Sequence, residues 1–147
     1  MYKRRIMEGH YYYIGCFVSR EELFHCVKGI STGHLDRLIE APHITFEYKP
    51  DEVDESLFGE RIRVAAVGYG NDGQNEGLKV KVYADNKKIT GMAEKIEVPH
   101  ITLSVGREGR AYDTRHLEFY AIKPFELEGV FGGYRQDGTI NTMHSLA

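Results

Sequence analysis

The 147-residue sequence contains no tryptophan, two cysteines and four prolines. Two cysteines are too few for a disulfide framework, and the positions of Cys16 and Cys26 fit neither a CxxC pair nor a zinc finger. Two reduced thiols are typical of a cytoplasmic protein, which is the location we expect. Without tryptophan, any aromatic surface that holds a ligand must be built from tyrosine or phenylalanine.

The sequence also lacks a long apolar run and an excess of basic residues. No stretch approaches the length of a membrane span, and the opening MYKRRIMEGHYYYIG has no apolar core for a secretory signal. The net charge is −3, whereas proteins that hold long DNA or RNA usually carry a large positive charge. We therefore expect no membrane partner and no long nucleic acid, but a small anionic ligand is compatible with this charge.

The apolar content is sufficient for a packed domain. Hydrophobic residues make up 41% of the chain, which argues against disorder. A chain of this length fits one domain or two small lobes that share a core. Because no linker interrupts the sequence, we expect residues 1–147 to form a single bilobal domain.

Strands and helices are mixed along the chain. Ser19 and Glu22 form a capping-box pattern for a helix that runs to about Lys28 and stops at Gly29. Runs rich in aromatic and β-branched residues predict strands at 10–18, 43–48, 61–69, 78–83, 100–105, 117–122 and 125–134. The connections are of hairpin type, so we expect an α+β fold with largely antiparallel sheets.

Other segments are less well defined by their composition. Residues 51–58 suit a short helix, residues 70–77 a hairpin loop, and residues 106–115 a polar loop. Residues 35–40 fit either a helical turn or a loop. Residues 85–96 are ambiguous, with helix favoured near their end.

One short segment occurs twice, as EAPHITF from Glu40 and as EVPHITL from Glu97. On a strand, residues i and i+2 project from the same face. His43 and Thr45 therefore share one face, and the apolar residues beside them share the other; the same holds for His100 and Thr102. Each strand thus combines an apolar face for a core with a polar face that bears an imidazole and a hydroxyl.

Two such polar faces in one groove suit phosphodiester cleavage. One imidazole takes a proton from the attacking hydroxyl or water while the other protonates the leaving oxygen, and both steps are feasible near neutral pH. The threonine hydroxyls donate hydrogen bonds to the non-bridging phosphate oxygens. This scheme needs no metal and no other cofactor.

Two less specific interpretations compete with this one. A single histidine on a strand is more often a hydrogen-bonded core residue than a catalyst, and a metal site would need a third ligand at a fixed spacing. Packing explains the repeated apolar residues, but it gives no reason for the same polar pair to occur twice. The duplication therefore favours catalysis.

Two H-x-T motifs on apolar strands, 57 residues apart in a small α+β chain, resemble the 2H phosphoesterase superfamily. The resemblance implies a LigT-like fold of two pseudo-symmetric lobes, each with a mainly antiparallel sheet and flanking helices, around a central cleft. It also implies that His43, Thr45, His100 and Thr102 are the catalytic set.

Members of this superfamily act on RNA ends with 2′,3′-cyclic phosphates, on 2′-5′ oligoadenylates and on cyclic oligonucleotides. The chain is most similar to the small phage-encoded branch that destroys cyclic di- and trinucleotide immune signals (anti-CBASS proteins). That resemblance implies substrate contacts from Tyr12, Glu128 and Tyr134, with Tyr69 or Tyr134 replacing the tryptophan of other members. A stacked base would contribute about 1–3 kcal/mol.

Each of these side chains also has an ordinary structural explanation. Tyr12 alternates with Tyr11 and Tyr13 on a strand, so only one of the two sets is expected to face the groove. Glu128 equally fits a solvent-exposed position. Among nearby basic residues, Arg107 and Arg110 follow the second motif closely and are candidates for a phosphate contact, but an exposed loop is the default interpretation for both.

The predicted function is a metal-independent phosphodiesterase that cleaves 3′-5′ bonds of a cyclic oligonucleotide, in the host cell cytoplasm if the protein is phage-encoded. The first alternative is an enzyme that opens 2′,3′-cyclic phosphates on short RNA ends. The second is a module that sequesters a cyclic nucleotide without cleaving it. The sequence makes the two histidines equivalent, so it assigns neither as base or acid, and it leaves the oligomeric state open.

Overall fold

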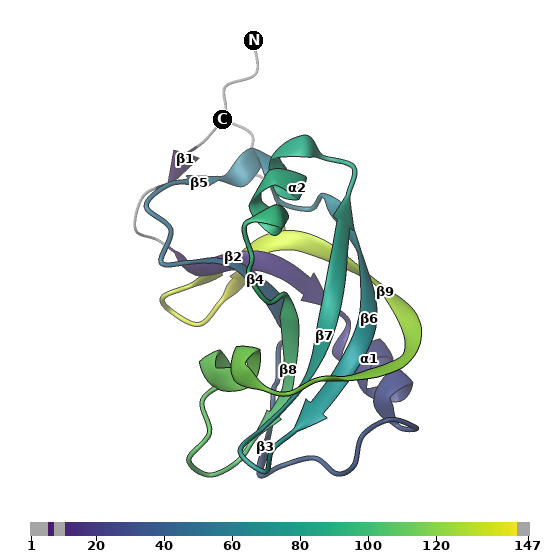
Figure 1. Ribbon diagram of the computed structural model, residues 1–147. Helices are drawn as coiled ribbons and strands as arrows, with labels where there is room; N and C mark the ends of the chain where they lie inside the picture. The colour runs from purple at the N-terminus through teal and green to yellow at the C-terminus, as the bar shows by residue number, and fades with distance from the viewer. Residues whose placement is uncertain (1–5, 8–10, 144–147) are drawn as a thin grey trace.

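The computed structural model describes residues 6–7 and 11–143 and has an α+β fold dominated by one antiparallel sheet (Figure 1). The elements in chain order are β1 (Ile6–Met7), β2 (Tyr11–Val18), α1 (Arg20–Val27), β3 (Arg37–Leu38), β4 (His43–Tyr48), β5 (Val53–Asp54), η1 (Glu55–Leu57), β6 (Arg61–Asn71), β7 (Asn75–Ala84), α2 (Lys87–Glu94), β8 (His100–Val105), η2 (Ala111–His116), β9 (Tyr120–Arg135) and β10 (Ile140–Asn141).

The main sheet has the strand order β3-β8-β7-β6-β9-β2-β4, with β10 beside β9, and β1 and β5 form a separate pair. The long strand β9 pairs with β6 and then with β2, and in Figure 1 β2 runs across the direction of β7. Although β4 and β8 lie near opposite ends of the sheet, they contact each other. The sheet is therefore curved so strongly that its two ends meet.

The core lies between the sheet and the two helices. Helix α1 packs on β9, and α2 packs on β7 and β4. Ile44 and Ile101, from the two repeated segments, are fully buried in this core, whereas His43, Thr45 and His100 are only half-buried. The expected division of each repeat into an apolar face and a polar face is therefore present in the fold.

Local signals fix several elements where we expected them. The hydroxyl of Ser19 accepts a hydrogen bond from the backbone N–H of Glu22, 3.2 Å away, and caps the start of α1. Strands β4 and β8 have the predicted bounds. The strand predicted from residue 10 is β2, and its predicted first residue, His10, lies outside the described residues.

Two segments differ in part from their predictions. The short helix expected at residues 51–58 is limited to η1, because residues 53–54 form β5 and pair with the distant strand β1. The hairpin loop is much shorter than residues 70–77. The Asp72 side chain accepts hydrogen bonds from the N–H groups of Gln74 (2.9 Å) and Asn75 (2.8 Å) and forms a tight turn. Pairing between β6 and β7 therefore continues up to Asn71 and Glu76.

The two strands expected at residues 117–122 and 125–134 are one strand, β9. Pro124 lies where the register between β6 and β9 shifts, so its missing N–H breaks no regular ladder position. The undecided segment at residues 35–40 contains β3, which pairs with β8. The ambiguous segment at residues 85–96 contains α2, capped by the side chain of Asn86.

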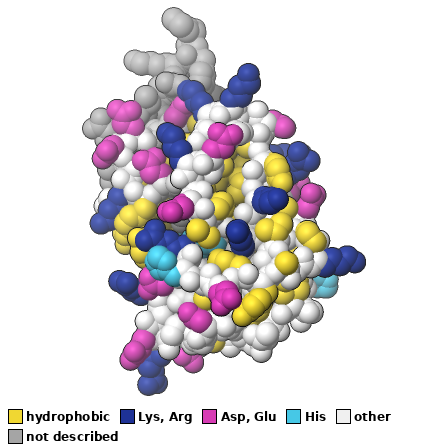
Figure 2. All heavy atoms as spheres, viewed as in Figure 1, with side chains coloured by type: hydrophobic (Ala, Val, Ile, Leu, Met, Phe, Trp, Pro, Cys, Tyr) yellow, Lys and Arg dark blue, Asp and Glu magenta, His cyan; other side chains and the backbone are white. Residues whose placement is uncertain are grey.

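Charges of both signs are distributed over the surface. On the face shown in Figure 2, Lys and Arg side chains are interspersed with Asp and Glu side chains. Within residues 6–7 and 11–143, no helix has the length and apolar character needed to cross a membrane.

Candidate active site

The two H-x-T strands have matching partner strands. In the pairing of β2 with β4, Gly15 lies opposite Thr45, and in the pairing of β7 with β8, Gly77 lies opposite Thr102. The register shifts immediately before each glycine. The repetition that is visible in the sequence of β4 and β8 therefore extends to the strands beside them.

The prolines before the two histidines are also held alike. The carbonyl of Pro42 accepts a hydrogen bond from the N–H of Val18 (3.3 Å), and the carbonyl of Pro99 accepts one from the N–H of Val80 (3.0 Å). Each of these valines lies three residues after the glycine opposite the threonine. The two repeats thus share a backbone hydrogen bond as well as a strand register.

Each imidazole is oriented by the carbonyl two residues before it. Nδ1 of His43 lies 2.9 Å from the carbonyl oxygen of Ala41, and Nδ1 of His100 lies 2.8 Å from that of Val98. Because a carbonyl oxygen only accepts, each Nδ1 carries a proton and donates it. Nε2 is therefore the nitrogen of each ring that is left for proton transfer.

The polar faces of both repeats line one cavity of about 830 Å³. His43, Thr45, His100 and Thr102 all contribute to its lining. The fold therefore brings together the four residues that the sequence predicted as a catalytic set. The rest of the lining includes four tyrosines and four ionisable side chains, namely Tyr12, Tyr13, Tyr48 and Tyr112, and Glu97, Arg110, Arg115 and His116.

His43 lies against an aromatic ring. Its imidazole stacks on Tyr13 with ring centroids 4.3 Å apart, and the Tyr13 hydroxyl lies 3.2 Å from Nδ1. The pKa of His43 is lowered to about 4: burial is the main cause, the Ala41 carbonyl opposes the shift, and the nearby His100 adds to it. His43 is therefore a neutral imidazole at physiological pH in the free protein.

His100 has a different charged neighbour. Burial lowers its pKa below the ordinary value of 6.5, the Val98 carbonyl opposes this effect, and the positive charge of Arg115 lowers the pKa further. A bound phosphate would offset the charge of Arg115 and make protonation of His100 easier.

The two threonines differ in their hydrogen bonds. Among the described residues, the Thr45 hydroxyl has no hydrogen-bond partner, and it is half-buried at the cavity. The Thr102 hydroxyl is buried and donates to Thr114 Oγ1 (2.7 Å), with the carbonyl of Ala111 3.2 Å away. Thr45 is thus free to contact a ligand, whereas Thr102 holds η2 against β8.

Glycine is required at position 77 by the close approach of η2. A Cβ atom there would lie 2.4 Å from Cγ2 of Thr114 and 2.8 Å from the carbonyl oxygen of Ile101. Gly77 therefore provides the space in which Thr114 reaches Thr102.

The predicted substrate contacts are only partly assembled. Tyr12 lines the cavity and is 41% exposed, with its ring edge-on to Tyr48 at 4.8 Å. Glu128 is exposed, does not line the cavity, and pairs with Arg61 at 3.2 Å. Tyr69 also lies outside the lining, because its buried hydroxyl donates to Glu76 at 2.6 Å. Tyr134 stacks behind Tyr13 at 5.1 Å and is not part of the lining.

The expectation that only one set, either Tyr12 or the pair Tyr11 and Tyr13, faces the groove was wrong, since Tyr12 and Tyr13 both line the cavity. The register between β2 and β9 shifts between residues 11 and 13, which breaks the strict alternation of faces. A bulge of this kind depends on the partner strand and leaves no reliable signal in the sequence of β2.

Several lining residues were missed because they lie outside the repeated segments, in a stretch with no regular pattern. Tyr112, Arg115 and His116 belong to η2, which lies within the segment expected to be a polar loop. Of the two arginines noted in the sequence, Arg110 lines the cavity and Arg107 does not. The density of basic and aromatic residues between 107 and 116 was the signal available.

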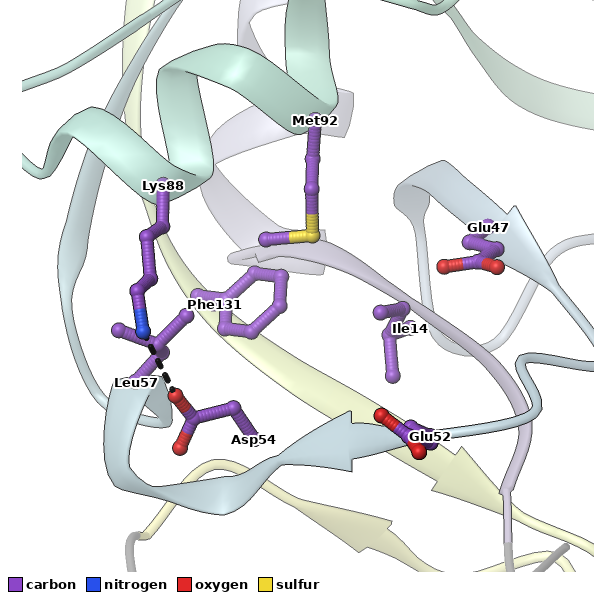
Figure 3. A pocket seen from close by; sticks show the side chains of 8 residues that line it. All are labelled: Ile14, Glu47, Glu52, Asp54, Leu57, Lys88, Met92 and Phe131. Atoms are coloured by element: carbon purple, nitrogen blue, oxygen red, sulfur yellow. Dashed lines mark hydrogen bonds and ion pairs between the residues drawn. The ribbon is translucent and has the colours of Figure 1, made fainter. Parts of the chain in front are cut away.

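A second, smaller cavity of about 270 Å³ lies beneath α2 (Figure 3). Its floor is apolar, with Met92 of α2 pointing toward Phe131. Lys88 reaches from α2 to Asp54, with 3.5 Å between Nζ and Oδ2. No histidine lines this cavity among the described residues, so the imidazole pair belongs to the larger one.

In the part of the chain that the structure describes, no three His, Cys, Asp or Glu side chains are grouped so as to hold a metal ion. No protein-family model and no curated protein matches this chain.

Proposed function

We propose that the protein is a metal-independent phosphodiesterase of the 2H type that cleaves a 3′-5′ bond of a cyclic di- or trinucleotide. The observation that carries this proposal is the pair of imidazoles that line one cavity. In each of them Nδ1–H donates to a backbone carbonyl, and Nε2 is left for proton transfer. Such a pair supplies a base and an acid for the same phosphodiester.

In the proposed reaction, Nε2 of His43 takes the proton of the attacking hydroxyl, which is a ribose 2′-OH or water. The new P–O bond forms as the bond to the leaving oxygen breaks, and Nε2–H of His100 gives its proton to that oxygen. We assign His43 as the base because its pKa of about 4 keeps it unprotonated, and because the positive charge of His100 is one cause of that low value, which makes His100 the histidine that holds a proton. The Thr45 hydroxyl donates to a non-bridging phosphate oxygen and stabilises its charge.

The repeated strand pairs support a 2H-type architecture. The β2–β4 and β7–β8 pairs share three features. Each has a glycine opposite the threonine, a valine N–H that donates to the proline carbonyl, and a backbone carbonyl that accepts from Nδ1 of the histidine. We propose that these pairs are the centres of two pseudo-symmetric lobes with the cavity between them.

The lining of the cavity favours a small nucleotide ligand. Tyr12, Tyr48 and Tyr112 are exposed aromatic rings beside the histidines, and such rings stack bases. The net charge of −3 and the mixed charges seen in Figure 2 give little attraction for long RNA. A short RNA end with a 2′,3′-cyclic phosphate is the second candidate, because the same histidine pair fits its chemistry.

A substrate panel tests the proposal. The protein is incubated with cyclic di-AMP, cyclic di-GMP, a cyclic trinucleotide and an RNA oligonucleotide with a 2′,3′-cyclic end, and the products are separated by chromatography. We expect linear products from the cyclic oligonucleotides. Cleavage of the RNA end alone would contradict the cyclic substrate and support the second candidate. Tight binding without any product would indicate a sequestering module.

A further inference from the structure

We propose that η2 forms a second phosphate subsite, in which Arg110 and Arg115 hold the phosphate of the substrate that is not being cleaved. The inference rests on the proposed function and specifies the substrate as one that carries at least two phosphates. It assigns a role to a segment that belongs to neither H-x-T motif.

The first argument is that η2 is fixed to the catalytic strand. Thr102 of β8 donates to Thr114 of η2 at 2.7 Å. Asn75 of β7, which is 3% exposed, donates to Thr114 Oγ1 (3.0 Å) and to the carbonyl of Arg110 (2.6 Å). These hydrogen bonds hold Arg110, just before η2, and Thr114, within it, at a set position relative to β8 and therefore to His100.

The second argument is that the two guanidinium groups are oriented before a ligand arrives. The Arg115 guanidinium carbon lies 4.0 Å from the centroid of the Tyr112 ring, and Nη2 donates to the Tyr112 hydroxyl. Nε of Arg110 lies 3.3 Å from Asp113, which leaves its Nη groups for another partner. An oriented guanidinium loses less side-chain freedom on binding a phosphate than a mobile one does.

The third argument concerns charge and space. Among the described residues, the lining of the cavity contains two arginines and one carboxylate, that of Glu97, although Asp113 pairs with Arg110 just outside the lining. Arg115 has no carboxylate partner of this kind in that part of the chain, and its charge acts on His100. One phosphodiester between the histidines occupies a small part of about 830 Å³. A cyclic dinucleotide places its second phosphate across the same ring, whereas a nucleoside 2′,3′-cyclic phosphate has none.

The test compares Arg110→Gln, Arg115→Gln and the matched control Arg107→Gln on cyclic di-AMP and on 2′,3′-cyclic AMP. For each cavity arginine we expect KM for cyclic di-AMP to rise about tenfold more than KM for 2′,3′-cyclic AMP. A difference of this size corresponds to the loss of one charge-assisted hydrogen bond. Arg107→Gln is expected to change neither KM. Calorimetric titration of cyclic di-AMP into His43→Ala and into His43→Ala/Arg115→Gln measures the same difference in Kd without turnover.

Equal changes for the two ligands would overturn the subsite, because a purely electrostatic effect of Arg115 on His100 acts on both substrates alike. Wild-type cleavage of 2′,3′-cyclic AMP without binding of cyclic di-AMP would overturn the subsite and the cyclic substrate, but not the histidine pair. If the wild-type protein neither binds nor cleaves any member of the substrate panel, the proposed function fails as well.

Discussion

The ring of Tyr13 lies against the imidazole of His43, with centroids 4.3 Å apart and planes inclined by 20°. Tyr134 stacks on the other side of Tyr13 at 5.1 Å, with nearly parallel planes. Within the described residues, no aromatic ring stacks on His100 in this way. Two histidines that are equivalent in the sequence therefore have different surroundings in the fold.

The stacking of Tyr13 on His43 leads to a prediction about the pKa of His43. Burial is the main reason that the pKa of His43 is low, so Tyr13→Ala, which admits water to the ring, is expected to raise that pKa from about 4 toward 6.5. An NMR titration of the His43 imidazole measures the shift. The substitution is also expected to lower the free energy of unfolding by about 3 kcal/mol, since it removes a buried ring.

Tyr13→Phe is the matched control for this experiment. It keeps the ring over His43 and removes the hydroxyl 3.2 Å from Nδ1, so the pKa should stay close to 4. If the pKa of His43 does not change in Tyr13→Ala, its low value does not depend on the stack.

Replacing either histidine tests catalysis directly. His43→Ala and His100→Ala are each expected to lower turnover about 10²- to 10⁴-fold, because each removes a proposed proton-transfer group. Both side chains are half-buried at the cavity, so the fold should survive, which circular dichroism verifies. Unchanged turnover in both variants would contradict the catalytic role.

The lowered pKa values predict an acidic pH optimum. The value of kcat/KM is expected to rise with pH as His43, the proposed base, loses its proton near pH 4. It is expected to fall again as His100, the proposed acid, loses its proton at a pH below 6.5. The measurement is kcat/KM at constant ionic strength from pH 3.5 to 8.5. A maximum above pH 7 would show that these two groups are not the base and the acid.

The two threonines are predicted to respond differently to the same substitution. Thr45→Val should lower turnover about 10- to 100-fold, through loss of a hydrogen bond to the phosphate, with little change in the free energy of unfolding. Thr102→Val should also destabilise the protein by about 1–2 kcal/mol, because it removes the buried hydrogen bond to Thr114. Urea denaturation separates the two cases, and equal stabilities would contradict the structural role of Thr102.

Removal of metal ions is the last prediction. The proposed reaction uses two imidazoles and no Lewis acid, so activity should persist in excess EDTA. A loss of activity that Mg²⁺, Mn²⁺ or Zn²⁺ restores would instead indicate a metalloenzyme.

The sequence by itself determined the elements whose signals are local. The Ser19 cap set the start of α1, and the alternation of polar and apolar residues set β4 and β8 and divided each of them into two faces. Because that alternation follows from strand geometry alone, it also identified His43, Thr45, His100 and Thr102 as one chemical set.

Only the tertiary structure decided what depends on contacts between distant segments. The curvature of the sheet brings β4 and β8 together, a bulge in β2 turns both Tyr12 and Tyr13 to the cavity, and pairing with β1 makes residues 53–54 a strand. The buried bonds from Thr102 and Asn75 bring Arg110 and Arg115 to the site. The two faces of each repeat can be predicted from the sequence because strand alternation is local. The cavity that unites the two repeats depends on long-range packing.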